Sequence, residues 1–265
     1  MDNVNSSSGF LFSETVFGPI KSRRLGNSLG INLLPTNKKI CTFDCIYCEC
    51  GWSPDETGVL EQLPSRAQVA EALETKLIHL KVQNNIPDSI TFAGNGEPTI
   101  HPEFPGIIYD TLKLRDKFFP DAEVTVLSNS SMIHKTEIFN ALSKVDNNIL
   151  KLDAGLESTF QLINRPRSKE LTLDRIVQNL RKFGHKAIIQ TLFLTGEVDG
   201  QTVDNTTTAE VHAWLGHIRF IKPRYVMLYP IDRQTPAPGL RVVPKEELMK
   251  IADKLSQIRV KSSVY

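Results

Sequence analysis

Short runs of apolar and β-branched residues alternate along the chain with segments in which apolar residues recur every three or four positions. The short runs predict buried strands, and the periodic segments predict amphipathic helices. The six predicted strands share an apolar core and lie at residues 28–34, 89–93, 123–127, 149–152, 186–194 and 225–229. The predicted helices, one after each strand, lie at residues 65–82, 104–118, 137–144, 173–183, 208–221 and 245–258.

Six strand–helix units in series favour a parallel sheet with its helices outside, because parallel strands need crossover connections. A closed eight-stranded barrel would need two more units, and no residues remain for them. We therefore expect an α/β fold, an open partial (βα)6 barrel of TIM type with a parallel six-stranded sheet. We expect a disordered tail at residues 1–12 and then a single barrel domain at residues 13–265, ending in a short helical segment.

Composition narrows the class of protein only slightly. The 265 residues include 31 basic and 30 acidic side chains, a net charge of +1, so there is no global basic field of the kind that nucleic-acid binders carry. Local basic patches remain open. No stretch approaches the ~20 apolar residues of a membrane span, and the polar first ten residues lack the pattern of a secretion signal. We expect a cytoplasmic protein without a membrane partner, in which thiols stay reduced.

All four cysteines lie within one short stretch of the chain. Cys41, Cys45 and Cys48 are separated by three and two residues, and Cys50 follows closely. In a reducing compartment such a cluster favours a metal site over a disulfide. Three thiolates on an iron–sulfur cluster would leave one iron open to a cofactor, whereas all four cysteines would suit a non-catalytic zinc module. Unligated structural cysteines are the third possibility.

Other unusual polar residues lie at or just beyond the ends of the predicted strands, where barrels collect their functional groups. Lys151 and Asp153 alternate along one strand, so their side chains share a face. A buried charged pair is costly unless its members pair with each other or bind a ligand, and both interpretations stay open. The whole set comprises Gly94, Asn95, Gly96, Glu97, Ser128, Asn129, Lys151, Asp153, Gln190 and Tyr229.

The cysteine spacing, with Tyr47 before the last cysteine, resembles the CxxxCxxC signature of the radical S-adenosylmethionine (radical SAM) superfamily. Residues 94–98 are similar to that family's GGEP-type motif. Residues 17–26 and 93–99 resemble a poorly characterised group of iron–sulfur oxidoreductases that is related to the wyosine-forming tRNA enzymes.

The resemblance implies a [4Fe–4S] cluster on Cys41, Cys45 and Cys48, with S-adenosylmethionine (SAM) on the fourth iron. The reduced cluster would cleave SAM to a 5′-deoxyadenosyl radical, which abstracts hydrogen from a substrate. Cys50 would remain outside the cluster, and no further catalytic residue is assigned. The residues implied to bind SAM are Tyr47, Gly94, Asn95, Gly96, Glu97, Ser128, Asn129, Lys151, Asp153, Gln190 and Tyr229.

We thus expect an oxidoreductase that uses SAM and a small electron donor of the flavodoxin or ferredoxin type. By analogy with the related enzymes, we expect the reaction to be RNA-base modification or methyl transfer. The substrate would be either an RNA or an anionic small molecule. The alternatives are the zinc module and an activating enzyme for a glycyl-radical partner. Four arginines near predicted strand ends are candidates to bind an anionic group, a solvated surface being the other interpretation: Arg23, Arg24, Arg165 and Arg233.

Overall fold

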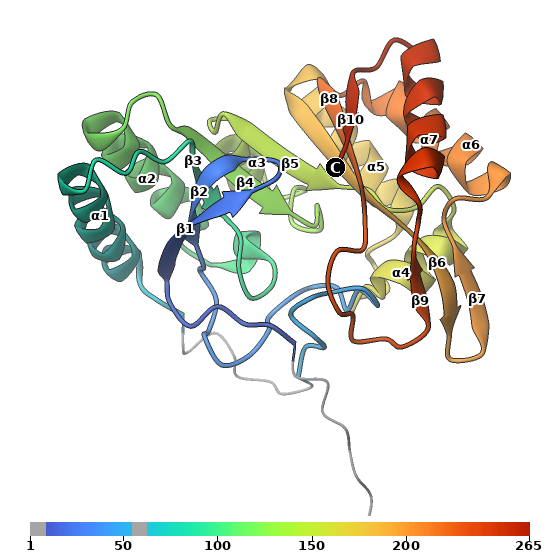
Figure 1. Cartoon of the computed structure of the whole chain (residues 1–265), viewed down its shortest axis with the longest axis horizontal. Helices are drawn as coiled ribbons and strands as arrows, with labels where there is room; N and C mark the ends of the chain where they lie inside the picture. The colour runs from blue at the N-terminus through green and yellow to red at the C-terminus, as the bar shows by residue number, and fades with distance from the viewer. Residues whose placement is uncertain (1–8, 55–62) are drawn as a thin grey trace, which may run out of the picture.

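The computed structural model describes residues 9–54 and 63–265, which form a sheet of ten strands with helices packed outside it (Figure 1). The strands are β1 (Val16–Ser22), β2 (Gly26–Ile31), β3 (Ser89–Phe92), β4 (Glu123–Ser128), β5 (Asn147–Lys151), β6 (Ala187–Val198), β7 (Gln201–Asp204), β8 (Tyr225–Pro230), β9 (Leu240–Val242) and β10 (Ser262–Val264). The helices are α1 (Arg66–Val82), α2 (Phe104–Phe118), α3 (Thr136–Leu142), α4 (Glu157–Asn164), α5 (Leu173–Phe183), α6 (Thr208–Ile221) and α7 (Lys245–Gln257), with 3-10 turns η2 (Pro98–Ile100) and η3 (Gly184–Lys186).

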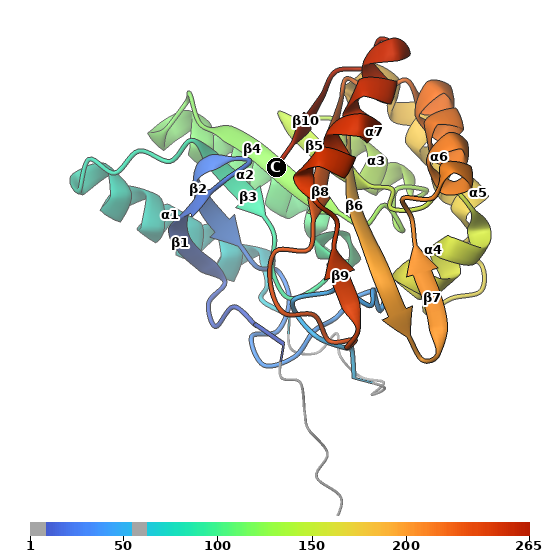
Figure 2. The same cartoon turned by 45° about the vertical axis from the view of Figure 1, so that its right-hand side comes forward.

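The predicted α/β fold with a mostly parallel sheet is confirmed. The main sheet has the order β1-β2-β3-β4-β5-β6-β8-β10, and every pairing from β2 to β10 is parallel. The six predicted strands correspond to β2, β3, β4, β5, β6 and β8. Figure 2 shows β6 running toward the side of the molecule on which the blue loops that follow β2 lie. The carboxyl ends of the parallel strands therefore face the segment that carries the cysteines.

Ten strands rather than six are present because short antiparallel and edge strands extend the sheet. β1 pairs antiparallel with β2, and its Gly18 and Pro19 hide the strand from a pattern search. β7 and β9 both pair antiparallel with the extended end of β6, and β10 adds three residues beside β8. Helix α4 was also not predicted. The sequence pattern therefore predicted the central parallel strands but not the short edge strands or helix α4.

The strands bury both faces, as parallel strands covered by helices do. All four residues of β3 and the first eight of β6 are buried. The face toward the helices is apolar, whereas hydroxyl groups join the first strands on the inner face: Ser28 Oγ lies 2.8 Å from Thr91 Oγ1, and Ser89 Oγ donates to Thr125 Oγ1 at 2.9 Å. These hydroxyl groups thus link β2, β3 and β4 across the inner face of the sheet.

Residues 1–8 of the tail expected at residues 1–12 lie outside the described part. Within the rest of that range, Phe10 N donates to Glu49 O at 2.7 Å and Phe12 N donates to Asn95 Oδ1 at 2.8 Å. The single domain expected at residues 13–265 stays a prediction. Among the described helices, none is long and apolar enough to cross a membrane.

Glu210 fixes the loop that follows β5. Its carboxylate is 3% exposed and accepts from Gly155 N at 2.8 Å, from Leu156 N at 3.3 Å and from Thr159 Oγ1. Helix α4 has no side-chain cap of its own, so this acid from α6 satisfies the donors at its amino end. The loop after Asp153 is therefore held by a neighbouring helix.

We expect Glu210→Ala to lower the free energy of unfolding by about 3 kcal/mol, because it leaves buried backbone donors unpaired. Urea denaturation of the two proteins would measure the difference. Glu246→Ala is the matched control, since Glu246 is exposed in the first turn of α7 and should cost well under ~1 kcal/mol. Equal losses in the two variants would contradict this role for Glu210.

Candidate functional site

Backbone pairing holds the cysteine segment on both sides. On one side Ile40 pairs with Gly96: Ile40 N donates to Asn95 O at 2.9 Å, and Glu97 N donates to Ile40 O at 3.0 Å. On the other side Phe43 pairs with Pro166. The segment is thus fastened to the loop after β3 and to the chain that follows α4, so its thiols have fixed positions over the sheet.

The two glycines of the loop after β3 are required by this close packing. A Cβ at Gly96, whose φ is +136°, would collide with the carbonyl oxygen of Ile40. A Cβ at Gly94 would collide with the side chain of Asn32. The sequence interpretation assigned both glycines to the approach of a ligand; the structure shows that they also let two loops of the protein meet.

All four cysteines, Cys50 included, line one cavity of about 280 Å³ at the carboxyl ends of the strands. Most of the residues predicted to bind the cofactor line the same cavity. They are Tyr47, Gly94, Gly96, Glu97, Ser128, Asn129, Lys151, Gln190 and Tyr229. Strands far apart in the sequence thus bring these groups together, as expected for residues at strand ends.

Asn95 and Asp153 do not line this cavity. Asn95 is fully buried, and its Nδ2 donates to Phe12 O at 2.9 Å and to Pro35 O at 2.8 Å. Its side chain therefore joins the chain before β1 to the loop after β3. The contacts of the Asn95 side chain are thus with protein groups.

Asp153 is the acceptor of a buried hydrogen-bond network. It is 2% exposed and accepts from Tyr47 OH, from Asn164 Nδ2 at 2.9 Å and from Leu192 N at 2.9 Å. Lys151 Nζ lies 3.5 Å from the same carboxylate. Four different segments of the chain thus meet at one carboxylate.

Lys151 both pairs with Asp153 and faces the cavity. Its Nζ donates to Tyr47 OH at 2.8 Å and to Tyr229 OH at 3.3 Å. Burial by itself would lower the pKa of Lys151, but the charges of Asp153, Tyr229 and Cys45 outweigh it and raise that pKa above the usual value. The structure therefore keeps an ammonium group at the cavity wall at neutral pH.

Glu97 is saturated by protein donors. It is 1% exposed and accepts from Ser128 Oγ at 2.9 Å, from Asn129 N at 2.5 Å, from Thr99 N at 3.1 Å and from Thr99 Oγ1. Burial raises the pKa of Glu97, although these hydrogen bonds oppose the rise. The acid thus ties the loop after β3 to the end of β4 and orients Ser128 and Asn129.

Amide groups donate to two of the thiol sulfurs. Asn129 Nδ2 lies 3.4 Å from Cys41 Sγ, and Asn164 Nδ2 lies 3.4 Å from Cys45 Sγ. Hydrogen bonds to sulfur stabilise its anionic form and tune the reduction potential of bound clusters. Asn164 was missed from the sequence, because it ends a helix that the pattern did not predict.

Lys39 is a second functional residue that sequence reasoning missed. It is 2% exposed, and its Nζ donates to Gly51 O at 2.9 Å and to Asp44 Oδ1 at 3.2 Å. Burial alone would lower the pKa of Lys39, but the charges of Cys48, Cys41, Cys45 and Asp44 raise it instead. The only indication in the sequence that Lys39 belongs to the site was its position two residues before Cys41. A buried cation therefore lies among the clustered sulfurs.

The thiols differ strongly in acidity. Burial raises the pKa of Cys41 to about 12 and also raises that of Cys45. A hydrogen bond from Cys50 lowers the pKa of Cys48 to about 6, and the charge of Lys39 contributes to this. The pKa of Cys50 rises correspondingly, and its thiol also lies 3.5 Å from Gly94 O. Cys50 thus acts as a neutral donor beside the other three.

The donor set fits a multi-iron cluster. A single zinc ion needs thiolates that converge at ≈ 2.3 Å, and no three His, Cys, Asp or Glu side chains within residues 9–54 and 63–265 form such a group. In a cluster each cysteine binds a different iron, so the sulfurs need not converge on one point. Cys41, Cys45 and Cys48 face one cavity, amide N–H groups donate to the first two, and the charges of the buried Lys39 and Lys151 act on the sulfurs, as suits an anionic cluster.

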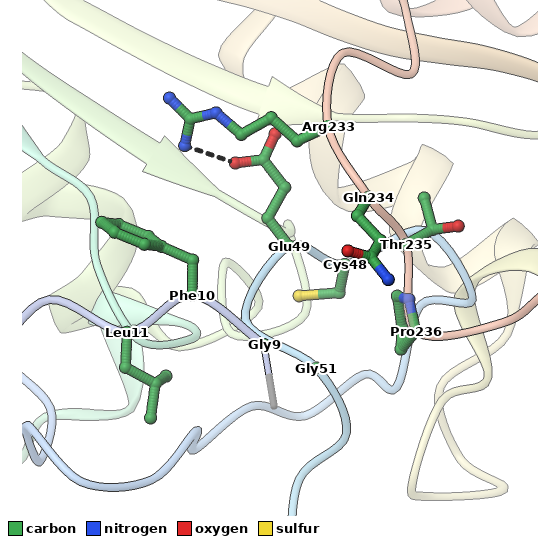
Figure 3. A pocket seen from close by; sticks show the side chains of 10 residues that line it. All are labelled: Gly9, Phe10, Leu11, Cys48, Glu49, Gly51, Arg233, Gln234, Thr235 and Pro236. Atoms are coloured by element: carbon green, nitrogen blue, oxygen red, sulfur yellow. Dashed lines mark hydrogen bonds and ion pairs between the residues drawn. The ribbon is translucent and has the colours of Figure 1, made fainter. Parts of the chain in front are cut away.

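A wider cavity of about 620 Å³ reaches Cys48 from the outside. Figure 3 shows the sulfur of Cys48 at its wall, between Phe10 on one side and Thr235 on the other. Arg233 and Glu49 form an ion pair of 2.9 Å across its edge. The cysteines are therefore close to the molecular surface on this side.

Sequence comparison places the chain among known proteins. Residues 38–206, more than half of the chain, match the model of the Radical SAM superfamily. The chain is 33% identical over 252 residues to a protein named GTPase Obg of Brachyspira hyodysenteriae, covering 94% of this chain and 34% of that protein. It is 34% identical over 167 residues to a UPF0026 protein of Methanocaldococcus jannaschii, covering 63% of this chain and 49% of that protein. The chain thus spans only a third to a half of these relatives.

Structural comparison gives the same fold. A radical SAM methyltransferase from Sphaerobacter thermophilus superposes with a TM-score of 0.65 at 12% identity, covering 90% of this chain and 65% of that one. TYW1 with a lysine-pyruvate adduct bound gives a TM-score of 0.54 at 15% identity, covering 87% of this chain and 73% of that one. At these identities the likeness establishes the fold alone.

In protein prepared without iron, we expect iodoacetamide to alkylate Cys48 first, at a rate that rises through about pH 6 and then levels off. Below that pH the thiol is protonated and unreactive. Cys50→Ala should slow the reaction at pH 7 on the order of tenfold, because removal of the hydrogen bond raises the pKa of Cys48. Mass spectrometry of the labelled peptides measures this. Equally fast labelling of Cys41 and Cys48 would contradict the assignment.

Proposed function

This chain belongs to the radical SAM superfamily, and on that premise we propose that it is a radical SAM enzyme in which Cys41, Cys45 and Cys48 hold a [4Fe–4S] cluster. The observation that carries the proposal is the single cavity onto which these three thiols, the Cys50 thiol and the cationic Lys151 open. Cys50 is left outside the cluster, because its thiol is engaged with Gly94 O. The fourth iron is thereby left for SAM.

When bound and reduced, the cluster would supply the electron that cleaves SAM to a 5′-deoxyadenosyl radical. Residues of the chain would stabilise the bound cluster by their charge and by hydrogen bonds to the cysteine sulfurs. Lys39 offsets the negative charge of the sulfurs, and the amides of Asn129 and Asn164 donate to two of them. Cys45 is buried, whereas Cys41 and Cys48 are half-buried and open on the cavity.

Lys151 is proposed to bind the carboxylate of SAM. It is the cation nearest to the cysteines on the cavity wall, and the charges around it hold it in the protonated form. Tyr47 and Tyr229 fix its direction by accepting from Nζ. Asp153 then acts as a positioning residue, since it holds Tyr47 and the end of β6 rather than lining the cavity.

The remaining wall residues are proposed to surround the rest of SAM. Ser128 and Asn129 are held by Glu97 at the ends of their strand and would contact the ribose hydroxyls. Glu97 has its own oxygens occupied, so its role is to orient that pair. Gly94, Gly96 and Gln190 complete the wall, and Asn95 supports the loop from behind.

The substrate and the net reaction belong to the proposal as well. An oxidoreductase that modifies an RNA base or transfers a methyl group remains the leading interpretation, with activation of a glycyl-radical partner as the alternative. A flavodoxin- or ferredoxin-type protein is proposed as the electron donor, because the outer cavity brings the surface close to Cys48. A zinc-binding module remains the other alternative, and the metal content of the reconstituted protein distinguishes the two.

Anaerobic reconstitution tests the proposal. We expect the protein to bind about four irons per chain and, with dithionite, to convert SAM to 5′-deoxyadenosine. Cys45→Ala should lose both the iron and the cleavage, because one of the three thiolates is removed. Cys50→Ala is the matched control and should keep both. Stoichiometric zinc without iron, or equal loss in the two variants, would overturn the assignment.

A further inference from the structure

Four arginines near strand ends were candidates to bind an anion, and three of them are already paired. Arg23 forms an ion pair of 2.7 Å with Asp232, and Arg165 forms one of 2.7 Å with Asp199. The third, Arg233, is the partner of Glu49 described above. Arg24 forms no ion pair with any carboxylate in the described part of the chain. Its charge is thus the one among the four that is left for a ligand.

Arg24 is nevertheless held in place. It follows β1, where Ser22 Oγ accepts from Arg24 N at 3.3 Å. Its guanidinium NH1 donates to Gln190 Oε1 at 3.1 Å, and its Cζ lies 4.8 Å from the centre of the Tyr229 ring. A stacked and singly hydrogen-bonded guanidinium keeps most of its five donors available. It is therefore a directed anion-binding group rather than a solvated side chain.

Besides the cavity that holds the cysteines, Arg24 lines a second cavity, which Cys50 borders but Cys41, Cys45, Cys48 and Lys151 do not. This cavity, of about 400 Å³, adjoins the site proposed for SAM and shares with it Arg24, Gly94 and Tyr229. Of these two cavities, only the smaller one is lined by Lys151, Cys41, Cys45 and Cys48. Tyr229 contacts both cations, Lys151 with its hydroxyl and Arg24 with its ring face. Lys151 thus lies beside the cysteines, whereas Arg24 borders both cavities; Lys21, Arg23 and Arg233 also line the adjoining one.

Aromatic rings form much of the wall around Arg24. The rings of Phe12 and Phe17 stack with their centres 3.8 Å apart, and Phe10 meets Phe12 edge-on at 5.0 Å. Leu127 and Leu192 add apolar surface. A space of this size suits a small molecule, and rings with one unpaired guanidinium suit a planar ligand that carries a single anionic group.

From these observations we propose that Arg24 binds the anionic group of the substrate, a small planar carboxylate or phosphate seated beside SAM. That this ligand is the substrate rests on the proposed function, whereas its binding does not need the cluster. A guanidinium binds a carboxylate or a phosphate through paired N–H donors, which gives both affinity and orientation. Arg24 is thereby the specificity-determining residue of this cavity.

The full chain prepared without iron tests binding alone, with phenyl phosphate and phenol as probes in saturation-transfer NMR. We expect phenyl phosphate to bind at least about tenfold more tightly than phenol, because only the phosphate engages the guanidinium. Arg24→Gln should weaken phenyl phosphate by about tenfold or more and leave phenol unchanged, and Arg24→Lys should restore part of the loss. Arg23→Gln is the matched control: Arg23 lines the same cavity but is exposed and paired with Asp232, so its loss should leave both affinities unchanged.

Equal affinity of the wild-type protein for the two probes, or equal losses in the Arg24→Gln and Arg23→Gln variants, would overturn the proposal. Thermal unfolding of each variant separates these outcomes from misfolding. In reconstituted protein, Arg24→Gln should leave the affinity for SAM unchanged. If this variant lost as much affinity for SAM as for phenyl phosphate, Arg24 would belong to the SAM site instead. If Arg24→Gln weakened the binding of a short RNA but not that of phenyl phosphate, the proposal that the ligand is a small molecule would be overturned. Failure of reconstitution would count against the proposed function and leave the probe result standing.

Discussion

The backbone pairing of Ile40 with Gly96 is the contact on which the site depends. It places the first cysteine beside the loop after β3, although more than fifty residues separate the two segments. The pairing is possible only because Gly96 has no Cβ to meet the carbonyl of Ile40. From this point one chain direction leads to Cys41 and the other to Glu97, which holds the end of β4. Thiols and cofactor-binding residues are therefore positioned by one shared contact.

Buried charge is the second constraint. Lys39 and Lys151 are ammonium groups inside the protein, and burying such a group costs several kcal/mol unless nearby anions compensate. Asp44 and Asp153 supply part of the compensation. The sulfurs supply the rest only when they are anionic, yet burial raises the pKa values of Cys41 and Cys45. An anionic iron–sulfur cluster would supply the missing negative charge. The two buried lysines would therefore be fully compensated when the cluster is bound.

The sequence predicted the parts of the structure that follow from local pattern. Apolar β-branched runs identified the parallel strands, and the rule that parallel strands end on one side identified most of the cavity wall. What it missed depends on partners distant in the chain. Lys39 lies in a polar segment that is typical of a solvated surface. Asn164 donates a hydrogen bond to Cys45, which is 119 residues away in the sequence. Asn95 and Gly94 are neighbours in the motif, yet only the structure shows that Asn95 binds protein groups.

The central claim is that three cysteines leave one iron open for SAM. Electron paramagnetic resonance of the reduced, reconstituted protein, recorded with and without SAM, tests it most directly. Our account predicts that SAM changes the signal of the cluster, because it coordinates iron directly, and that the Cys50→Ala variant shows the same change. A cluster signal that SAM leaves unaltered in the wild-type protein, but alters once Cys50 is replaced, would show that Cys50 is the fourth ligand and would contradict the account.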